Sequence, residues 1–272
     1  MKDLRLALHE IVPRVLASPS LAILTDFDGT LTPIVDHPDH ARLSARGRRA
    51  LRALTGGPWT VVGVVSGRRL RDLVRRVGLK GIWYVGTHGF EIRSPLGETE
   101  RCYTPEEEGF MAGVAEEIEE ATSSVKGVYC EPKGPSVAVH FRKVPLRQRP
   151  EVDRALLRIL VRHHPRVILA RGLQVVEARL RLPVSKGTAV RRMCRDLPEA
   201  AAVLYFGDDE TDRDAFREVV GRGWRVAVGG LSGPADYTLP GPDAVIEVLE
   251  ALSRLTSNVP GPGGDRNPPK IR

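Results

Sequence analysis

Acidic side chains form two clusters, and each cluster directly follows an apolar run. Asp26 and Asp28 lie in the segment T-D-F-D-G-T, and the second cluster lies in F-G-D-D-E-T-D, beginning with Asp208. The apolar runs before them, 21–25 and 202–206, are typical of buried β-strands. Open α/β sheets bind ligands at the carboxyl ends of their strands, so we expect both clusters at one sheet edge.

Carboxylates crowded at one edge repel one another, which costs stability unless a cation neutralises them. Taken alone, the pair Asp26 and Asp28 is more typical of a helix cap or a solvated loop, and the second cluster reverses that interpretation. Mg²⁺ takes oxygen ligands and completes its coordination with water and phosphate. Ca²⁺ is the alternative, but the acids lack the EF-hand spacing with its twelfth-position Glu. The sequence therefore predicts Mg²⁺ as the cofactor.

A phosphate bound beside the metal also needs hydrogen-bond donors and a positive charge. Ser66 ends the apolar run 59–65 and precedes a helical pattern whose first N–H groups could bind phosphate oxygens. Lys186 begins another helical pattern and could neutralise charge at the reacting centre. Each residue alone is more typical of a cap or a solvated lysine. As members of one set with the acids, they predict phosphate chemistry.

The elements that must position these residues alternate between strand and helix patterns. Apolar runs predict strands at Leu21 to Thr25, Trp59 to Val65, Ile82 to Val85, Ala202 to Phe206 and Trp224 to Val228. Amphipathic patterns predict helices at Ser44 to Leu54, Arg68 to Val77, Ser185 to Leu197 and Ala244 to Leu255. This alternation predicts an α/β fold with a doubly wound, mostly parallel, Rossmann-like sheet.

The segment 95–181 has a different pattern and predicts a small inserted α+β domain, with one sheet face covered by two helices. Apolar residues four apart around Val114 and Val152 predict the helices, and alternation from Ser136 to Arg142 predicts a half-buried strand. The core domain is accordingly predicted as residues 1–94 with 182–257. Residues 258–272, rich in Pro and Gly, predict a disordered tail.

Composition limits the class of protein and its partners. Of 272 residues, 42% are hydrophobic and 28% charged, and no apolar run approaches the length of a membrane span, so we expect a globular protein without a membrane partner. The net charge of +7 favours an anionic substrate or nucleic acid, but the arginines are scattered, so we expect no nucleic-acid partner. Three cysteines without paired spacing and a start without a signal-peptide pattern predict a cytoplasmic location.

The motifs D-x-D-G-T, S-G-R, K-G and G-D-D-x-x-D occur in that order and together resemble those of the haloacid dehalogenase-like phosphohydrolases. The resemblance implies that Asp26 is a nucleophile that forms a phosphoaspartate and that Asp28 is the general acid and base. Ser66 and Lys186 are implied as further catalytic residues. The implied Mg²⁺ ligands are Asp26, the main-chain carbonyl of Asp28, and Asp208. Asp209 and Asp212 are implied to hold metal-bound water or Lys186 in place.

Within that superfamily the inserted domain is a cap that sets substrate specificity. Its stretch E-P-K-G-P-S-V-A-V-H-F-R resembles the cap signature of the trehalose-6-phosphate phosphatases, and further similarity extends from about Leu21 to Leu252. The resemblance implies that the substrate is bound by Glu131, Lys133 and Ser136, together with Arg68, His88 and Glu177. His140 and Arg142 either contact sugar or brace the cap sheet. On its residues alone, the same stretch is typical of a hairpin with a solvated face.

The resemblance implies a phosphatase that hydrolyses trehalose 6-phosphate to trehalose and phosphate, with a functional link to a trehalose-6-phosphate synthase. One alternative is a phosphatase for sucrose 6-phosphate or a glycosyl-3-phosphoglycerate. Another is a non-catalytic sugar-phosphate-binding regulatory domain, although such a domain has no need of both Asp26 and Asp28. Two departures concern the sequence pattern: Arg213 stands where the family often has an acid, and Gly134-Pro135 forms a stiff turn before Ser136.

Overall fold

The computed structural model describes residues 1–57, 59–172, 174–231 and 233–258. The chain forms two compact units, one of Met1–Glu100 with Val184–Arg272 and one of Arg101–Pro183. The last helix extends to Asn258, the first residue of the predicted tail, and the rest of that tail lies outside the described residues. Within the described ranges, no helix combines the length and apolarity that crossing a bilayer requires.

The first unit is built on a nine-stranded sheet with the order β1-β13-β12-β11-β2-β3-β4-β5-β6. Its strands are β1 (Lys2–Asp3), β2 (Leu21–Asp26), β3 (Thr60–Val65), β4 (Trp83–Gly86), β5 (Glu91–Arg93), β6 (Thr99–Arg101), β11 (Ala202–Gly207), β12 (Gly223–Val228) and β13 (Tyr237–Leu239). The strands from β1 through β4 in this order pair in parallel, and β5 pairs antiparallel with β4. The predicted doubly wound, mostly parallel sheet is confirmed.

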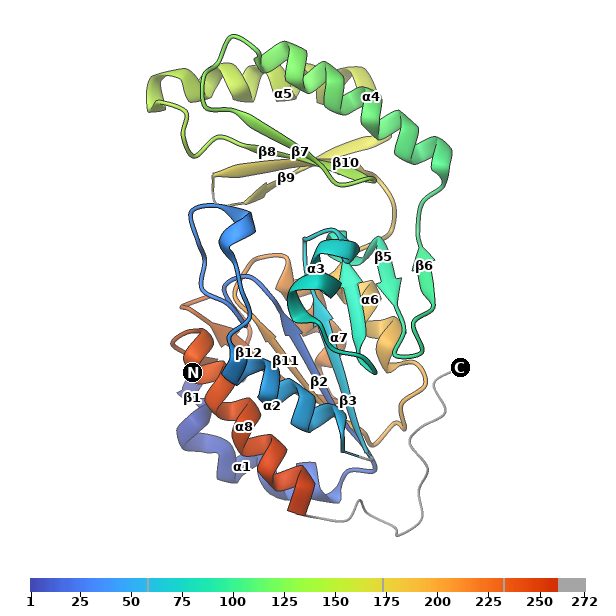
Figure 1. Cartoon of the computed structure of the whole chain (residues 1–272), viewed down its shortest axis with the longest axis vertical. Coiled ribbons are helices and arrows are strands. Elements are labelled where there is room, and N and C mark those ends of the chain that lie inside the picture. Colours follow the sequence, from blue (N-terminus) through green and yellow to red (C-terminus); the bar gives the residue numbers. More distant parts are fainter. Residues whose placement is uncertain (58, 173, 232, 259–272) are drawn as a thin grey trace. The chain divides into compact units, whose positions relative to one another are not determined.

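Helices cover both faces of this sheet (Figure 1). They are α1 (Leu4–Ala17), α2 (Ala45–Thr55), α3 (Leu70–Val77), α6 (Lys186–Cys194), α7 (Asp212–Val219) and α8 (Pro242–Asn258), with short 3-10 turns η1 (Pro38–His40) and η2 (Thr87–Gly89). Side chains of β2 alternate between two apolar cores: Ile23 packs with α1, α2, α3 and α8, whereas Leu24 packs with α6 and α7. The strand that carries Asp26 is therefore buried from both sides, which fixes its position.

Local sequence signals explain where the site-bearing helices begin and end. The Ser185 side chain accepts a hydrogen bond from the Thr188 N–H, and the two form a capping box at the start of α6. This cap places Lys186 in the first turn of α6. Helix α3 ends at Val77 and is capped by Gly78, whose φ of 64° lies in the left-handed region that glycine adopts at low cost.

Short polar or edge elements were not apparent from the sequence pattern. The sequence pattern does not predict helix α7, because its sequence D-R-D-A-F-R-E-V is mostly charged. Its apolar face consists only of Ala215, Phe216 and Val219. Strands β5, β6 and β13 have three residues each, too few to establish an alternating pattern. The five strands predicted for the core are present as β2, β3, β4, β11 and β12.

The second unit is a four-stranded antiparallel sheet with the order β7-β8-β10-β9. Its elements are α4 (Pro105–Thr122), β7 (Tyr129–Pro132), β8 (Ser136–His140), η3 (Leu146–Gln148), α5 (Arg149–His163), β9 (Val167–Gly172) and β10 (Val175–Leu180). Helices α4 and α5 lie along one face of the sheet (Figure 1). Val137 and Val139 of β8 are buried, as expected for the apolar face beneath the helices, but Ser136 and Ala138 on the other face are buried as well, so the prediction of a half-buried strand is wrong here.

Candidate active site

The two acidic clusters meet at the carboxyl ends of neighbouring parallel strands. Strands β2 and β11 pair in register from Leu21 with Ala202 to Thr25 with Phe206, so Asp26 and Asp208 both lie just beyond the paired residues. Carboxylate oxygens of Asp26, Asp208 and Asp212 lie within 4.8 Å of one another. The structure thus brings together acids that are up to 186 residues apart in the chain, at the edge where open α/β sheets bind ligands.

Two glycines make room for this approach. A Cβ atom built on Gly29 would lie 1.9 Å from Oδ2 of Asp208, and the φ of Gly29 is +84°, so both space and backbone conformation require glycine there. A Cβ atom on Gly207 would lie 2.5 Å from Cβ and Cγ of Asp212. The glycines of D-x-D-G-T and G-D-D-x-x-D therefore have a steric role in assembling the acid cluster.

Lys186 is the cation within the acid cluster. Its Nζ donates to Oδ1 of Asp26 at 2.8 Å and to Oδ1 of Asp212 at 2.7 Å, and its side chain is 3% exposed. Burial raises the pKa of Asp26 well above its usual range, although the charge of Lys186 opposes this. Burial would lower the pKa of Lys186, but the charges of Asp212 and Asp26 outweigh it and raise that pKa. The ammonium therefore stays charged between its two acids.

Asp208 is held by a neighbour from the first motif. The buried Thr30 hydroxyl donates to Oδ1 of Asp208 at 2.9 Å. Burial raises the pKa of Asp208 to about 6, since removing water disfavours the charged carboxylate more than this hydrogen bond favours it. Asp209 has an exposed side chain, and its backbone N–H donates to Oδ2 of Asp212 at 3.1 Å. Asp209 thus acts on the cluster through its main chain.

The charge balance of this cluster fits a divalent cation. Three carboxylates and one ammonium, when all are ionised, carry a net charge of −2. Burying that charge uncompensated is costly. Oxygen donors of this kind are the ligands that Mg²⁺ prefers. The residues present therefore fit the predicted metal.

Asp28 and Arg68 form a bidentate ion pair. Nε of Arg68 donates to Oδ2 of Asp28 and its NH2 group donates to Oδ1, both at 2.7 Å. Arg68 also donates to Oδ2 of Asp72 at 3.0 Å and to the Pro38 carbonyl at 2.8 Å. The structure places Arg68 beside Asp28, the predicted general acid. The contact of Arg68 with substrate stays a prediction.

Ser66 and His88 are linked by the backbone of their loops. Ser66 is buried at the end of β3, and its carbonyl accepts from the His88 N–H at 3.0 Å. Thr87 and His88 have φ values of 47° and 56°, a conformation that costs on the order of 1–3 kcal/mol for non-glycine residues. The His88 imidazole packs where a side chain on Gly67 would stand. The strained turn at His88 is thereby fixed against the S-G-R segment.

The second unit carries its own polar cluster. Ala138 of β8 pairs with Glu131 of β7 on one side and with Glu177 of β10 on the other, so the two glutamates share one face of the sheet. Ser136 and His140, two residues to either side of Ala138, lie on that face as well. This face is the one opposite Val137 and Val139.

Within this cluster, each of the two glutamates has a side-chain partner. The buried Ser136 hydroxyl donates to Oε1 of Glu177 at 2.6 Å. Oε2 of Glu131 lies 3.0 Å from Nε2 of His140 and 3.8 Å from Nζ of Lys133. The predicted sugar-contacting residues of this unit, Glu131, Lys133, Ser136 and Glu177, thus occur together, and His140 lies beside Glu131.

Sequence reasoning missed two buried hydroxyls that hold the acids. Thr30 lies in the motif D-x-D-G-T, and Tyr205 lies in the apolar run 202–206, and neither pattern assigns a role to the hydroxyl. The Tyr205 hydroxyl donates to Oδ1 of Asp212 at 2.7 Å. A polar group in the middle of an otherwise apolar strand was the signal that could have identified Tyr205, because such a group needs a partner.

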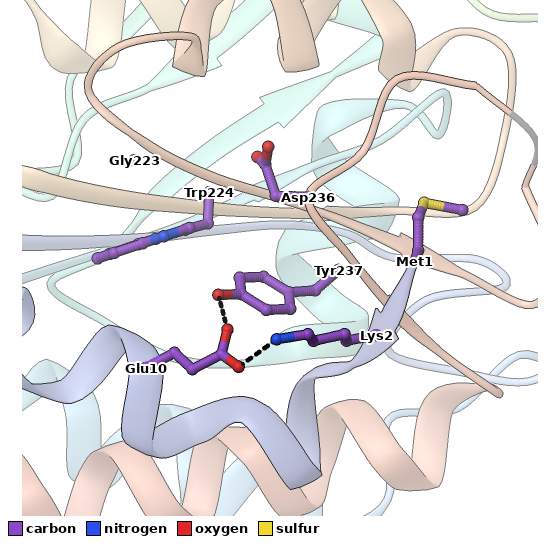
Figure 2. A pocket seen from close by; sticks show the side chains of 7 residues that line it. All are labelled: Met1, Lys2, Glu10, Gly223, Trp224, Asp236 and Tyr237. Carbon is purple, nitrogen blue, oxygen red and sulfur yellow. Dashed lines mark hydrogen bonds and ion pairs between the residues drawn. The ribbon is translucent and has the colours of Figure 1, made fainter.

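A cavity of about 660 Å³ lies at the opposite edge of the core sheet, at the amino ends of β1, β12 and β13. Glu10, one of its lining residues, pairs with Lys2 at 2.6 Å and accepts from the Tyr237 hydroxyl at 3.1 Å (Figure 2). Asp236 pairs with Arg225 at 2.7 Å. The charged groups of this cavity have partners, and the cavity lies away from the acid cluster.

The doubly wound sheet, the second α+β unit and acids at two adjacent strand ends define a haloacid dehalogenase-like fold. The family profile described as trehalose-phosphatase matches residues 24–228. A curated trehalose-phosphate phosphatase of Mycobacterium tuberculosis strain H37Rv is 34% identical over 253 residues, which cover 88% of this chain and 63% of that protein. The chain belongs to the trehalose-phosphatase family and spans less than two thirds of the length of that relative.

Solved structures agree with this assignment. The C-terminal domain of trehalose-6-phosphate phosphatase from C. albicans has a TM-score of 0.79 and 24% identity, with 93% of this chain and 98% of that chain covered. The trehalose-6-phosphate phosphatase of Aspergillus fumigatus has a TM-score of 0.65 and 27% identity, with 90% and 97% covered. At 24% identity, the similarity to the C. albicans structure concerns the fold alone.

Proposed function

We propose that this protein is a magnesium-dependent phosphatase that hydrolyses trehalose 6-phosphate to trehalose and phosphate through a phosphoaspartate. The observation that carries the proposal is Asp26, buried at the end of β2 and paired with Lys186, with Asp208 and Asp212 beside it. Membership of the trehalose-phosphatase family supports the substrate. We further propose that residues 1–94 with 182–257 supply the chemistry and that 95–181 is a specificity cap.

In the first step an oxygen of Asp26 attacks phosphorus, and the bond between phosphorus and the sugar oxygen breaks. A protonated Asp28 gives its proton to the departing sugar oxygen, so that trehalose leaves as an alcohol. The product on the protein is an aspartyl phosphate. A carboxylate nucleophile divides one difficult displacement into two easier ones, and a placed acid contributes about 10²- to 10⁴-fold.

In the second step water attacks the phosphorus of the aspartyl phosphate. Asp28, now ionised, takes a proton from that water, and the bond between phosphorus and Asp26 breaks. Phosphate leaves, and Asp26 and Asp28 return to their starting states. The exposed fraction of the Asp28 side chain, 38%, compared with 6% for Asp26, is consistent with a group that must exchange protons.

Mg²⁺ would be held by Asp26, Asp208 and the Asp28 main-chain carbonyl, and when bound it would neutralise charge on the phosphoryl oxygens. Lys186 directs two of its three N–H donors to Asp26 and Asp212, which leaves one donor to bind a phosphoryl oxygen. We propose that Ser66 and the N–H groups that follow it bind the other phosphoryl oxygens. Asp212 would keep Lys186 in place rather than react itself.

Substrate choice is proposed to depend on the polar face of the second unit. Carboxylates of Glu131 and Glu177 can accept from sugar hydroxyls, while Lys133 can donate to them. We also propose that Arg68 and His88 contact the substrate. Sucrose 6-phosphate and a glycosyl-3-phosphoglycerate are the alternative substrates. A non-catalytic regulatory domain is the alternative of another class, and the presence of the full acid set with Lys186 disfavours it.

A reaction that makes trehalose 6-phosphate from two sugar units must precede this one, so we propose a functional link to a trehalose-6-phosphate synthase. We also propose a cytoplasmic location. Its support is that the sequence contains three cysteines without paired spacing, as expected in a reducing compartment.

The sugar site is tested by replacing Lys133 with Met. We expect Lys133→Met to lower kcat/KM for trehalose 6-phosphate by about 10- to 100-fold, because a donor to a sugar hydroxyl is lost, and to change turnover of p-nitrophenyl phosphate by less than about threefold. The exposed Lys126, in the same unit, provides the matched control Lys126→Met, which should behave like the wild type. Equal losses on both substrates would contradict the assignment of Lys133 to sugar binding.

The covalent intermediate is tested by borohydride reduction during turnover. Borohydride reduces an aspartyl phosphate to homoserine, so peptide mass spectrometry should find homoserine at position 26 only when substrate and Mg²⁺ are both present. Homoserine at another aspartate, or at none while phosphate is released, would contradict Asp26 as the nucleophile.

A further inference from the structure

Tyr205 carries a buried phenol that the mechanism above does not use. It lies in the middle of β11, its side chain is fully buried, and its ring packs edge-on against Phe216 at 5.8 Å between ring centroids. A phenylalanine ring would serve this packing equally well. A hydroxyl buried among apolar groups costs stability unless it is hydrogen-bonded, so its partner is informative.

That partner is Asp212. The Tyr205 hydroxyl donates at 2.7 Å to Oδ1 of Asp212, the same oxygen that accepts from Nζ of Lys186 at 2.7 Å. The other oxygen of Asp212 accepts from the Asp209 N–H at 3.1 Å. Asp212 is fully buried and therefore depends on these protein donors in place of water.

The donors approach Asp212 from three different elements. Tyr205 comes from β11, Asp209 from the loop after β11, and Lys186 from α6. Burial, followed by the charge of Asp212, raises the pKa of the Tyr205 phenol, so the hydroxyl keeps its proton and stays a donor. Tyr205 thus ties the orientation of the Asp212 carboxylate to strand β11 of the sheet.

We propose that Tyr205 is a positioning residue for phosphoryl transfer: it fixes Asp212, which in turn directs the Lys186 ammonium to Asp26. Nζ of Lys186 lies 2.8 Å from Oδ1 of Asp26, so a change in Asp212 is passed on to the nucleophile through one side chain. The catalytic consequence rests on the proposed phosphatase function. The positional consequence, that Asp212 and Lys186 depend on the phenol, does not.

The test is Tyr205→Phe, which removes one oxygen and keeps the ring. We expect kcat to fall by about 10- to 100-fold with both trehalose 6-phosphate and p-nitrophenyl phosphate, while KM changes by less than about twofold. A fall in kcat without a change in KM would distinguish a positioning role of Tyr205 from a role in substrate binding.

The chain offers a control in Tyr237, whose hydroxyl also donates to a carboxylate, that of Glu10, in a partly buried hydrogen bond (Figure 2). Tyr237 lies at the opposite, amino-terminal edge of the same sheet. We expect Tyr237→Phe to retain wild-type kcat. Equal losses of kcat in both variants would attribute the effect to general loosening of the sheet and overturn the proposal.

Two further measurements keep the inference separate from the phosphatase assignment. In a crystal structure of Tyr205→Phe we expect the distance between Lys186 Nζ and Asp26 Oδ1 to lengthen beyond hydrogen-bonding range, or Asp212 to change rotamer. Unchanged positions of both side chains would overturn the proposal even in an inactive protein. If instead the wild type releases no phosphate from any substrate, the phosphatase assignment fails while the structural comparison still decides the role of Tyr205.

A double-mutant cycle covers the case in which Tyr205→Phe is too unstable to crystallise. If Tyr205 acts through Asp212, adding Tyr205→Phe to Asp212→Asn should lower kcat by less than about twofold beyond the single Asp212 variant. Additive losses would show that Tyr205 acts by another route and would overturn the proposal.

Discussion

At the scale of single residues, the side chains of the acid cluster carry more negative charge than the protein itself neutralises. Asp26, Asp208 and Asp212 lie close together, and Lys186 compensates for only one of their charges. Burial raises the pKa of Asp26 and of Asp208, which means that the ionised carboxylates cost folding free energy. These ionised carboxylates are therefore present at the expense of stability.

Asp26→Asn should abolish phosphate release and leave the fold intact. The substitution removes the proposed nucleophile, while the amide oxygen can still accept from Lys186 and the side-chain volume is nearly unchanged. Since the ionised carboxylate is costly at this position, we expect the melting temperature without metal to stay the same or rise. Circular dichroism and a phosphate-release assay measure the two effects. An unfolded variant would reveal a structural role for the carboxylate.

Metal binding should stabilise the folded protein through Asp208. Mg²⁺ at about 100 times its dissociation constant should add about 2.7 kcal/mol to the free energy of unfolding. Asp208→Asn should lose most of this gain, because it replaces a charged carboxylate ligand with a neutral amide, whose oxygen can still accept from the Thr30 hydroxyl. Exposed Glu210, in the same loop and paired with Arg213, gives the control Glu210→Gln. An equal Mg²⁺-induced rise in melting temperature for wild type and Asp208→Asn would place the metal elsewhere.

The acids, Ser66 and Lys186 could be selected from the sequence because each follows an apolar run or begins a helix pattern, so that topology alone brings them to one edge. Thr30 and Tyr205 could not be assigned a role in this way. Their function lies in which carboxylate each hydroxyl reaches, and that depends on side-chain packing between elements far apart in the chain. The same holds for Asp28 and Arg68, whose bidentate pair joins residues 40 positions apart.

At the scale of elements, helix α3 holds the loop that follows the first motif. Arg76 donates to the Ala41 carbonyl at 2.7 Å, and Arg68 donates to the Pro38 carbonyl at 2.8 Å. Both arginines are in turn bound by Asp72, one at 3.0 Å and the other at 2.6 Å. Asp72 therefore organises the contact between α3 and the loop 33–43.

Asp72→Asn should destabilise the protein in a pH-dependent manner. Burial alone would raise the pKa of Asp72, but hydrogen bonds from Arg76, Arg75 and Arg68 lower it overall. A carboxyl whose folded-state pKa is below its unfolded value stabilises the fold above about pH 4 and loses this contribution as the pH falls. We expect a loss of about 1–2 kcal/mol at pH 7 and a smaller loss at pH 3, measured by urea unfolding.

The control for Asp72 is Asp196→Asn, at an exposed carboxylate of the same unit, which should change the free energy of unfolding by less than about 0.5 kcal/mol at either pH. A loss for Asp72→Asn that is as large at pH 3 as at pH 7 would show that shape, not charge, explains the role of Asp72.

Elements with strong apolar periodicity were predictable, and weakly apolar ones were not. Strand β2 is buried along its whole length, and its first four residues, 21–24, form an uninterrupted apolar run. Helix α7 begins with Asp212, a site residue, yet its mostly charged sequence conceals it until the packing of Phe216 is known. The elements hardest to predict therefore include one that carries part of the site.

At the scale of the whole molecule, two compact units carry two different polar clusters. The first contains the acids and Lys186, which suit phosphoryl chemistry, and the second contains Glu131, Lys133, Ser136 and Glu177, which suit sugar hydroxyls. On the proposed function, substitutions of the acids and Lys186 in the first unit affect every phosphate ester equally, whereas substitutions of the polar cluster in the second unit affect only the sugar phosphate. This separation makes the two parts of the proposal independently testable.

The most direct test of the proposed function is phosphate release from a panel of sugar phosphates, measured with Mg²⁺ and with EDTA. The panel contains trehalose 6-phosphate, sucrose 6-phosphate, a glycosyl-3-phosphoglycerate and p-nitrophenyl phosphate. We predict that trehalose 6-phosphate is hydrolysed with the highest kcat/KM and that EDTA abolishes the activity. Magnesium-dependent preference for another member of the panel would contradict the substrate, and no release from any member would contradict the enzymatic function.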